Sequence, residues 1–126
     1  MKIILPHQRI WKKERNYVKK ILLYDKDIKG KIGQILMAKF KPGSKKEPHW
    51  HKIQTEIFFV LSGGAKIIIN GEEFRCYPGE IIICEPNEIH EVINDTNQDF
   101  RILVLKINPK KQDIYFLSDQ ESEKRT

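Results

Sequence analysis

The chain has 126 residues, enough for one domain with one buried core and too few for two domains of typical size. With 40% hydrophobic and 32% charged residues, it has the balance of a folded soluble protein, which excludes wholesale disorder and collagen-like repeats. The longest apolar runs, IFFVL at 57–61 and III at 81–83, are far shorter than the roughly 20 residues that span a bilayer, so no membrane segment is expected.

The net charge of +6 is unevenly distributed along the chain. Residues 1–46 carry fourteen Lys and Arg against three Asp and Glu, whereas residues 47–126 carry nine against fourteen. Clustered cations such as Lys45-Lys46 attract nucleic acid or anionic metabolites, but a lysine-rich solvated face is the simpler interpretation. No helix-turn-helix, zinc-finger or RNA-recognition motif accompanies the lysines, so nucleic acid is not an expected partner.

The amino-terminal sequence and the two cysteines indicate in which cellular compartment the protein is expected. MKIILPHQRIW has only three successive apolar residues before Pro6, which is not the longer apolar stretch of a secretory signal, so a cytoplasmic location is expected. Cys76 and Cys84 lie in strand-like segments without CxxC spacing. Each is therefore expected to be a small buried hydrophobe and not half of a disulfide.

In chain order, the first ambiguous stretch is the amino-terminal one. Apolar residues between Ile10 and Leu22 fit one helical face, but residues 18–24 also fit a strand, which we favour. From about residue 30, Gly, Pro and Asn turn signals recur at short intervals, which favours many strands over a few long helices. The stretches between the turns are rich in Ile and Phe, and the expected strands are 34–40, 56–61, 66–70, 73–77, 80–84, 91–93 and 100–107.

Two features of these strands predict how they assemble. Asn70-Gly71 tolerates the positive φ angles of a two-residue type I′ turn, so a hairpin is expected there. The runs IFFVL and III stay apolar without alternating, which indicates strands covered on both faces by another element or another subunit. A dimer is therefore expected.

Three of the four histidines fall in two short patches, His49 and His51 in PHWH and His90 in NEIH. Residues i and i+2 of a strand point to the same side, so His49 and His51 present two imidazoles together while Trp50 faces away. Glu56 joins them only if residues 52–55 turn the chain. His90 lies 34 positions after Glu56, and a closed sheet such as a small barrel is needed to bring it back.

Three neutral imidazoles and one carboxylate suit a divalent ion of iron, manganese, nickel, copper or zinc. In octahedral geometry, four protein ligands leave two positions for water or substrate, and an open position distinguishes a catalytic metal from a structural one. Taken singly, each histidine is more often an ordinary core or surface residue. The spacing of the whole set favours the metal interpretation.

That spacing resembles the cupin superfamily. The first motif of the family is matched at every position by Gly43, His49, His51, Glu56 and Gly63, with intervals of five, one, four and six residues.

The second motif keeps its overall interval, with ten residues between Gly79 and His90 and three between His90 and Asn94. It departs from the family at Pro86-Asn87, where proline, one residue and glycine are usual. Asn is the non-glycine residue that best tolerates the left-handed conformation of a tight turn, so Asn87 is a plausible stand-in.

Similarity to cupins implies an all-β fold, a small jelly-roll-like double-stranded β-helix barrel, with His49, His51, Glu56 and His90 as metal ligands inside it near one mouth. It also implies a frequent homodimer, and the fifteen residues between the motifs are typical of compact single-domain members. We expect residues 1–117 to form the barrel with an amino-terminal strand extension, and residues 118–126 to form a polar tail.

Two classes of function remain open. One is a metal-dependent enzyme acting on a small oxygen-rich metabolite, either an isomerase or epimerase that chelates its substrate through two oxygens or a dioxygenase. The other is a non-catalytic barrel that binds or senses a small anionic or sugar ligand. No catalytic residue is assigned, because the polar residues near the motifs are more often surface or turn residues; these are Glu47, Gln54, Tyr77, Glu85 and Glu88.

Two further expectations concern the interior. Phe58 and Val60 share the strand parity of Glu56 and are expected to give the cavity an apolar wall, although core packing explains them equally well. Asn94 is interpreted as structural.

Overall fold

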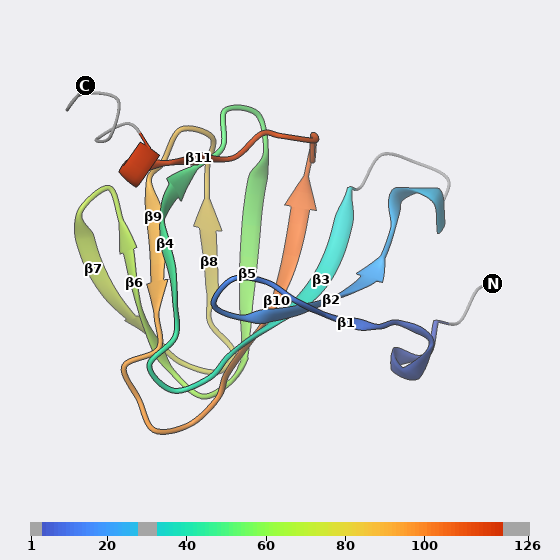
Figure 1. The fold of residues 1–126 in the computed structure, drawn as a ribbon, viewed down its shortest axis with the longest axis horizontal. Helices are drawn as coiled ribbons and strands as arrows, with labels where there is room; N and C mark the ends of the chain where they lie inside the picture. The colour runs from blue at the N-terminus through green and yellow to red at the C-terminus, as the bar shows by residue number, and fades with distance from the viewer. Residues whose placement is uncertain (1–3, 28–32, 120–126) are drawn as a thin grey trace.

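The computed structural model describes residues 4–27 and 33–119, which form two antiparallel sheets packed face to face (Figure 1). The strands are β1 (Trp11–Lys13), β2 (Val18–Leu23), β3 (Gln34–Phe40), β4 (Lys45–Trp50), β5 (Thr55–Ser62), β6 (Ala65–Ile69), β7 (Glu72–Cys76), β8 (Ile81–Cys84), β9 (His90–Ile93), β10 (Phe100–Ile107) and β11 (Tyr115–Phe116), with short 3-10 helices η1 (Pro6–Gln8) and η2 (Asp25–Asp27). One sheet has the order β1-β2-β3-β10-β5-β8 and the other β11-β4-β9-β6-β7. This two-sheet, all-β barrel is the architecture that the resemblance to cupins implies.

The core lies between the inner faces of the two sheets. Ile102 on β10 lies opposite Ala38 of β3 and Val60 of β5, and all three side chains are buried. Side chains alternate between the faces of a strand, so every second residue of β10 joins the core. The other buried apolar residues are Leu36, Phe40, Phe58, Ala65, Ile67, Cys76, Cys84, Val92, Phe100 and Val104. Both cysteines are thus buried, as expected.

Most strands end where the sequence predicts. The ranges 34–40 and 100–107 match β3 and β10, and the other five expected strands agree with the structure to within one residue at each end. The ambiguous stretch 18–24 is a strand and not a helix. β1 and β11 were not expected, since three and two residues carry too little pattern to be recognised. For β4, only an extended conformation around His49 and His51 was expected, and the strand ends at Trp50.

The turns also follow the sequence. Asn70 and Gly71 have φ angles of 49° and 82° and join β6 to β7 in the expected hairpin. Asn87 has a φ angle of 70°, the left-handed conformation for which asparagine replaces the usual glycine.

The outer face of β5 and β8 is less covered than expected. Phe59 and Leu61 are 39% and 38% exposed, and Ile81 and Ile83 are 61% and 51% exposed. Phe59 lies directly opposite Ile81, so these side chains form one apolar surface, which we call the β5–β8 face. Within the described chain only the inner side of these strands is buried.

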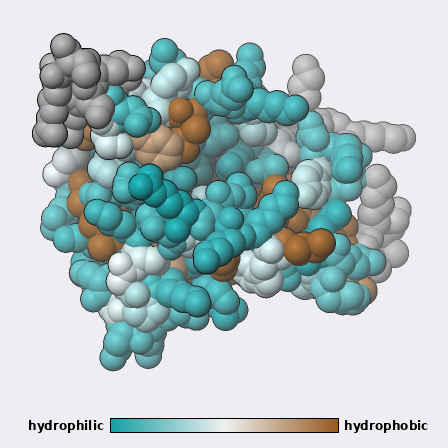
Figure 2. All heavy atoms as spheres, in the orientation of Figure 1, coloured by the Kyte–Doolittle hydropathy of each residue, from teal (hydrophilic) through white to brown (hydrophobic). Residues whose placement is uncertain are grey.

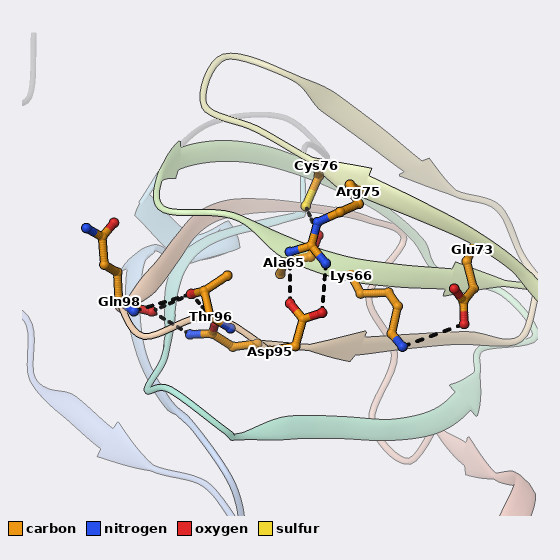
Figure 3. Close-up of polar contacts among 9 residues, drawn as sticks. Ala65, Lys66, Glu73, Arg75, Cys76, Asp95, Thr96 and Gln98 are labelled. Carbon is orange, nitrogen blue, oxygen red and sulfur yellow. Dashed lines mark hydrogen bonds and ion pairs between the residues drawn. The ribbon is translucent and has the colours of Figure 1, made fainter.

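Asn94 ties the loop after β9 to the barrel. Its side chain is fully buried and donates to the carbonyl oxygens of Phe40 and Gln98, at 2.9 and 2.8 Å, while its Oδ1 accepts from Thr96. On the surface beside it, Arg75 of β7 forms a paired contact with Asp95, at 2.7 and 2.8 Å (Figure 3). The expected structural role of Asn94 is confirmed by these contacts.

The surface on the side viewed in Figure 2 is mostly hydrophilic, with apolar residues in small separate groups. No helix among residues 4–27 and 33–119 is long and apolar enough to cross a membrane. Most of the expected polar tail, residues 120–126, lies outside the described residues.

Candidate metal centre

The four residues singled out by spacing meet at one point inside the barrel. His49 lies on β4, His51 just after β4, Glu56 on β5 and His90 at the start of β9. One potential ligand atom from each lies within 4.8 Å of the other three, and all four residues are buried. The structure therefore brings the whole predicted set together.

Strand pairing explains why distant segments converge. β4 pairs with β9, which places His49 directly opposite His90, with ring centroids 4.1 Å apart. Opposite residues of an antiparallel pair project from the same face. The chain then turns between β4 and β5, and this turn brings Glu56 to the same centre, as the sequence requires.

Each imidazole is oriented by a backbone carbonyl. The Nδ1 atoms of His49, His51 and His90 lie 2.7, 2.5 and 3.1 Å from the carbonyl oxygens of Glu47, Asp113 and Glu88. A carbonyl only accepts hydrogen bonds, so each Nδ1 carries the proton. The lone pair of each Nε2 is therefore available as a metal ligand, the arrangement by which proteins orient metal-binding histidines.

The electrostatics of the cluster favour the ligand forms of His49 and Glu56. At His51, burial by itself would lower the pKa, but the contacts with Glu56 outweigh burial and raise it. Burial, followed by the neighbouring His90, lowers the pKa of His49 to about 3, so its imidazole is neutral at physiological pH. Burial by itself would raise the pKa of Glu56, but the adjacent His51 and His90 outweigh it and hold this pKa well below its ordinary value. Neutral imidazoles and an ionised carboxylate are the forms that bind metal ions.

The cluster also leaves polar atoms without partners. The Nε2 atoms of His51 and His90 are buried and make no hydrogen bond of acceptable geometry, although they lie 2.5 and 3.4 Å from Glu56 Oε1. Buried polar atoms are almost always satisfied, and an exception calls for a specific reason. A divalent cation at the centre would satisfy both nitrogens and the carboxylate at once, so the donor set fits such an ion.

A segment near the carboxyl terminus supports the site and was not foreseen. Residues 108–116, the C-terminal strap, leave β10 and cross one end of the barrel to pair with β4 (Figure 1). The carboxylate of Asp113 accepts hydrogen bonds from the backbone N–H groups of Lys52, Ile53 and Gln54, at 2.8 to 3.0 Å. Asp113 thus holds the turn after His51 through its side chain and the His51 ring through its carbonyl.

The pKa of Asp113 reflects this role. Burial acts to raise the pKa, but the three N–H donors outweigh burial and hold the pKa below its ordinary value. The sequence carried a weak signal for this contact, since an Asp after the last long strand is common in turns.

The cluster opens onto a cavity of about 380 Å³. Beside His49, His51 and Glu56, it is lined by side chains from five further segments, among them Tyr17, Lys19, Lys46, Gln54, Lys106 and Phe116. Lys45 is exposed, as a solvated lysine face predicts, but its neighbour Lys46 is half buried in this cavity. Lys106 continues the inward parity of β10, a signal that sequence analysis overlooked.

The other polar candidates divide into three groups. Glu47 and Glu88 are half-buried, and their backbone carbonyls contact His49 and His90. Gln54 is 4% exposed and lies in the cavity, while Tyr77 and Glu85 are exposed. Phe58 and Val60 are buried as expected, and Phe58 packs edge-on against His90 with centroids 6.2 Å apart.

Solved structures resemble this chain in fold. A predicted oxalate decarboxylase from Thermotoga maritima superimposes with a TM-score of 0.78 at 21% identity, over 84% of this chain and 98% of the other. KdgF from a Halomonas species gives 0.76 at 20% identity, over 88% and 96%.

Sequence comparison agrees with the fold. The pectin degradation protein KdgF of Dickeya dadantii is 25% identical over 95 residues, which cover 75% of this chain and 80% of that protein. The family model for the cupin domain matches residues 36–106, more than half of the chain and including all four clustered residues. Together with the two-sheet barrel, this match shows that the chain belongs to the cupin family.

Proposed function

We propose that this cupin is a metal-dependent enzyme acting on a small oxygen-rich metabolite, with a divalent ion held by His49, His51, Glu56 and His90. The observation that carries the proposal is the position of the four potential ligand atoms. They lie together in the interior of the barrel, next to a cavity of about 380 Å³. Small-molecule sites typically have volumes of about 300–1,000 Å³. The ion is iron, manganese, nickel, zinc or copper, since all of them accept imidazole and carboxylate ligands.

When bound, such an ion would supply a Lewis acid that polarises substrate oxygens, and iron, manganese or copper would add redox chemistry. The three imidazoles are held rigid by backbone carbonyls, so the ligand set is ordered before any substrate arrives. Phe58 is buried and packs edge-on against His90, which gives this side of the centre an apolar wall. These features suit an isomerase or epimerase and a dioxygenase equally.

Relatives add limited support for an enzyme. Their names refer to the degradation of pectin, a polysaccharide, and to a predicted oxalate decarboxylase, and both pectin and oxalate are oxygen-rich. The identities of 20% to 25% do not transfer either activity to this chain.

A non-catalytic barrel that binds or senses a small ligand is the second candidate. It is favoured by the contacts of two acidic side chains in the described part of the cavity, Glu14 and Asp113, each of which already binds another group of the protein. Glu14 is paired with Lys19 at 2.9 Å, and Asp113 is bonded to backbone amides. Both carboxylates are thus engaged by other groups of the protein.

The two candidates differ in turnover. In the test, metal-stripped protein is reloaded with ferrous iron or manganese and given sugar phosphates, dicarbonyls or catechols. Oxygen consumption and product formation are measured. We expect turnover by the wild type. Glu56→Gln should reduce the rate at least about 100-fold, because the variant loses a charged ligand, whereas the exposed control Glu72→Gln should keep the wild-type rate. Tight binding without turnover supports the sensor, and turnover that survives Glu56→Gln contradicts the proposed site.

We also propose a homodimer formed through the β5–β8 face. β8 lies at the edge of its sheet and exposes Ile81 and Ile83 beside Phe59 and Leu61, and contiguous exposed apolar surface marks interaction sites. Light scattering of the wild type is expected to give twice the 14.9 kDa chain mass. The double variant Ile81→Lys with Ile83→Lys should be monomeric, whereas Ile10→Lys at the far edge should not. A monomeric wild type at micromolar concentration refutes the dimer.

A cytoplasmic location is also proposed. Cys76 and Cys84 are both buried free thiols, which is compatible with a reducing compartment.

A further inference from the structure

Three lysines from three different strands face the cavity beside the metal centre. Lys19 of β2 lies opposite the buried Ala38. Lys46 of β4 lies opposite the buried Val92, and Lys106 of β10 lies opposite Glu56. Because opposite residues of paired strands project from the same face, all three lysines point inward, and all three line the cavity.

The charges of these lysines are unequally compensated. Lys19 is paired with Glu14 at 2.9 Å. The ammonium of Lys46 lies 5.1 and 5.3 Å from the ring centroids of Tyr17 and Phe116, contacts that position a cation without neutralising it. Among the ion pairs of residues 4–27 and 33–119, none includes Lys46 or Lys106.

Glu14 and Glu56 act on these two lysines through their charge, but neither carboxylate forms an ion pair with Lys46 or Lys106. Glu56 faces His51 and His90, and Asp113 is bonded to backbone amides. A partly buried ammonium that makes no direct ion pair is disfavoured, and buried lysines are usually paired with an anion. A divalent ion at the centre would add further positive charge to the same cavity.

We propose that the ligand of this cavity has two acidic parts. The oxygens of one part face the metal centre, and a second anionic group, a carboxylate or a phosphate, binds between Lys46 and Lys106. The inference rests on the proposed function, because the same cavity must hold the ligand. It narrows the substrate class from oxygen-rich metabolites to acidic ones.

Matched pairs of small acids test the inference by calorimetry. Glycolate and malate share an α-hydroxycarboxylate, and malate adds a carboxylate; glycerate and 3-phosphoglycerate form the corresponding phosphate pair. Manganese-loaded wild type is expected to bind at least one of the doubly anionic acids about tenfold or more tightly than its partner, since hydrogen bonds to charged groups contribute at this level. The pair that shows the larger ratio identifies carboxylate or phosphate as the second anion.

Methionine variants assign the effect to the lysines. Lys106→Met and, as a second variant should the first not fold, Lys46→Met are expected to reduce the ratio to near one without lowering the affinity for manganese. The control is Lys45→Met, which removes an exposed lysine from the same strand as Lys46 and should keep the wild-type ratio. A wild-type ratio near one for both pairs, or an equal loss in Lys45→Met, overturns the inference.

Failure of the proposed function has a different signature. If the wild type does not bind manganese, the metal proposal is wrong, and the lysines are then tested in metal-free protein with inorganic phosphate as the probe. Wild type and Lys45→Met are expected to bind phosphate saturably, and Lys106→Met to lose this binding. Equal binding by all three proteins overturns the inference independently of the metal.

Discussion

Replacing His51 with alanine is expected to lower the affinity of this cupin for a divalent ion at least about 100-fold while leaving the fold intact. Removing even a residue that only orients a ligand typically costs 10- to 100-fold, so losing a ligand itself should cost no less. The barrel core is apolar and does not include His51, so folding does not depend on it. Competition with a chelator measures the affinity, and circular dichroism reports the fold.

A graded series sharpens this test. Asp113→Ala keeps every ligand but frees the turn that holds His51, and about a tenfold loss of affinity is expected. Asp99→Ala removes an exposed carboxylate elsewhere and should have no effect. Wild-type affinity in His51→Ala would show that this imidazole is not a ligand, and an unfolded variant would show that the site is structural.

The second large effect is expected on stability. Asn94→Ala removes two hydrogen bonds to backbone carbonyls and two from Thr96, and leaves the buried carbonyl of Phe40 without this donor. Each lost hydrogen bond costs about 1 kcal/mol, and an unsatisfied buried group costs about 1–3 kcal/mol. Only the bond to Phe40 is fully buried, and water partly replaces the other three, so the free energy of unfolding should fall by about 3–4 kcal/mol. Urea denaturation in the presence of a chelator measures this loss.

The control for this variant lies in the same loop. Asn97 is exposed, so Asn97→Ala is expected to change the free energy of unfolding by less than about 0.5 kcal/mol. Equal losses in the two variants would mean that the loop as a whole, and not the buried amide of Asn94, stabilises the barrel.

The parts of the structure that the sequence predicts are those governed by short-range rules. Strand alternation and the Asn70-Gly71 turn depend on neighbouring residues, and they predicted most strands to within one residue. The metal cluster was predicted for a different reason. His49 and His51 were expected to share a strand face, and motif spacing supplied Glu56 and His90, whose distance along the chain is otherwise uninformative.

The residues that were missed act across long distances. Asp113 contacts Lys52–Gln54 about sixty positions away, and no local pattern reveals that pairing. Lys46 was interpreted as solvated together with Lys45, and this was wrong. An irregularity in the pairing of β4 with β9 changes which residues face inward, and no local pattern reveals it. Lys106 was detectable by parity but follows a run of apolar residues that reads as core.

The central claim is that His49, His51, Glu56 and His90 bind one divalent ion inside the barrel. Anomalous diffraction from a crystal soaked in manganese, or zinc, tests this directly. The account predicts one strong peak per chain, at about 2.0–2.3 Å from the three Nε2 atoms and a Glu56 oxygen. No peak at this centre, or a peak coordinated by other residues, would contradict it.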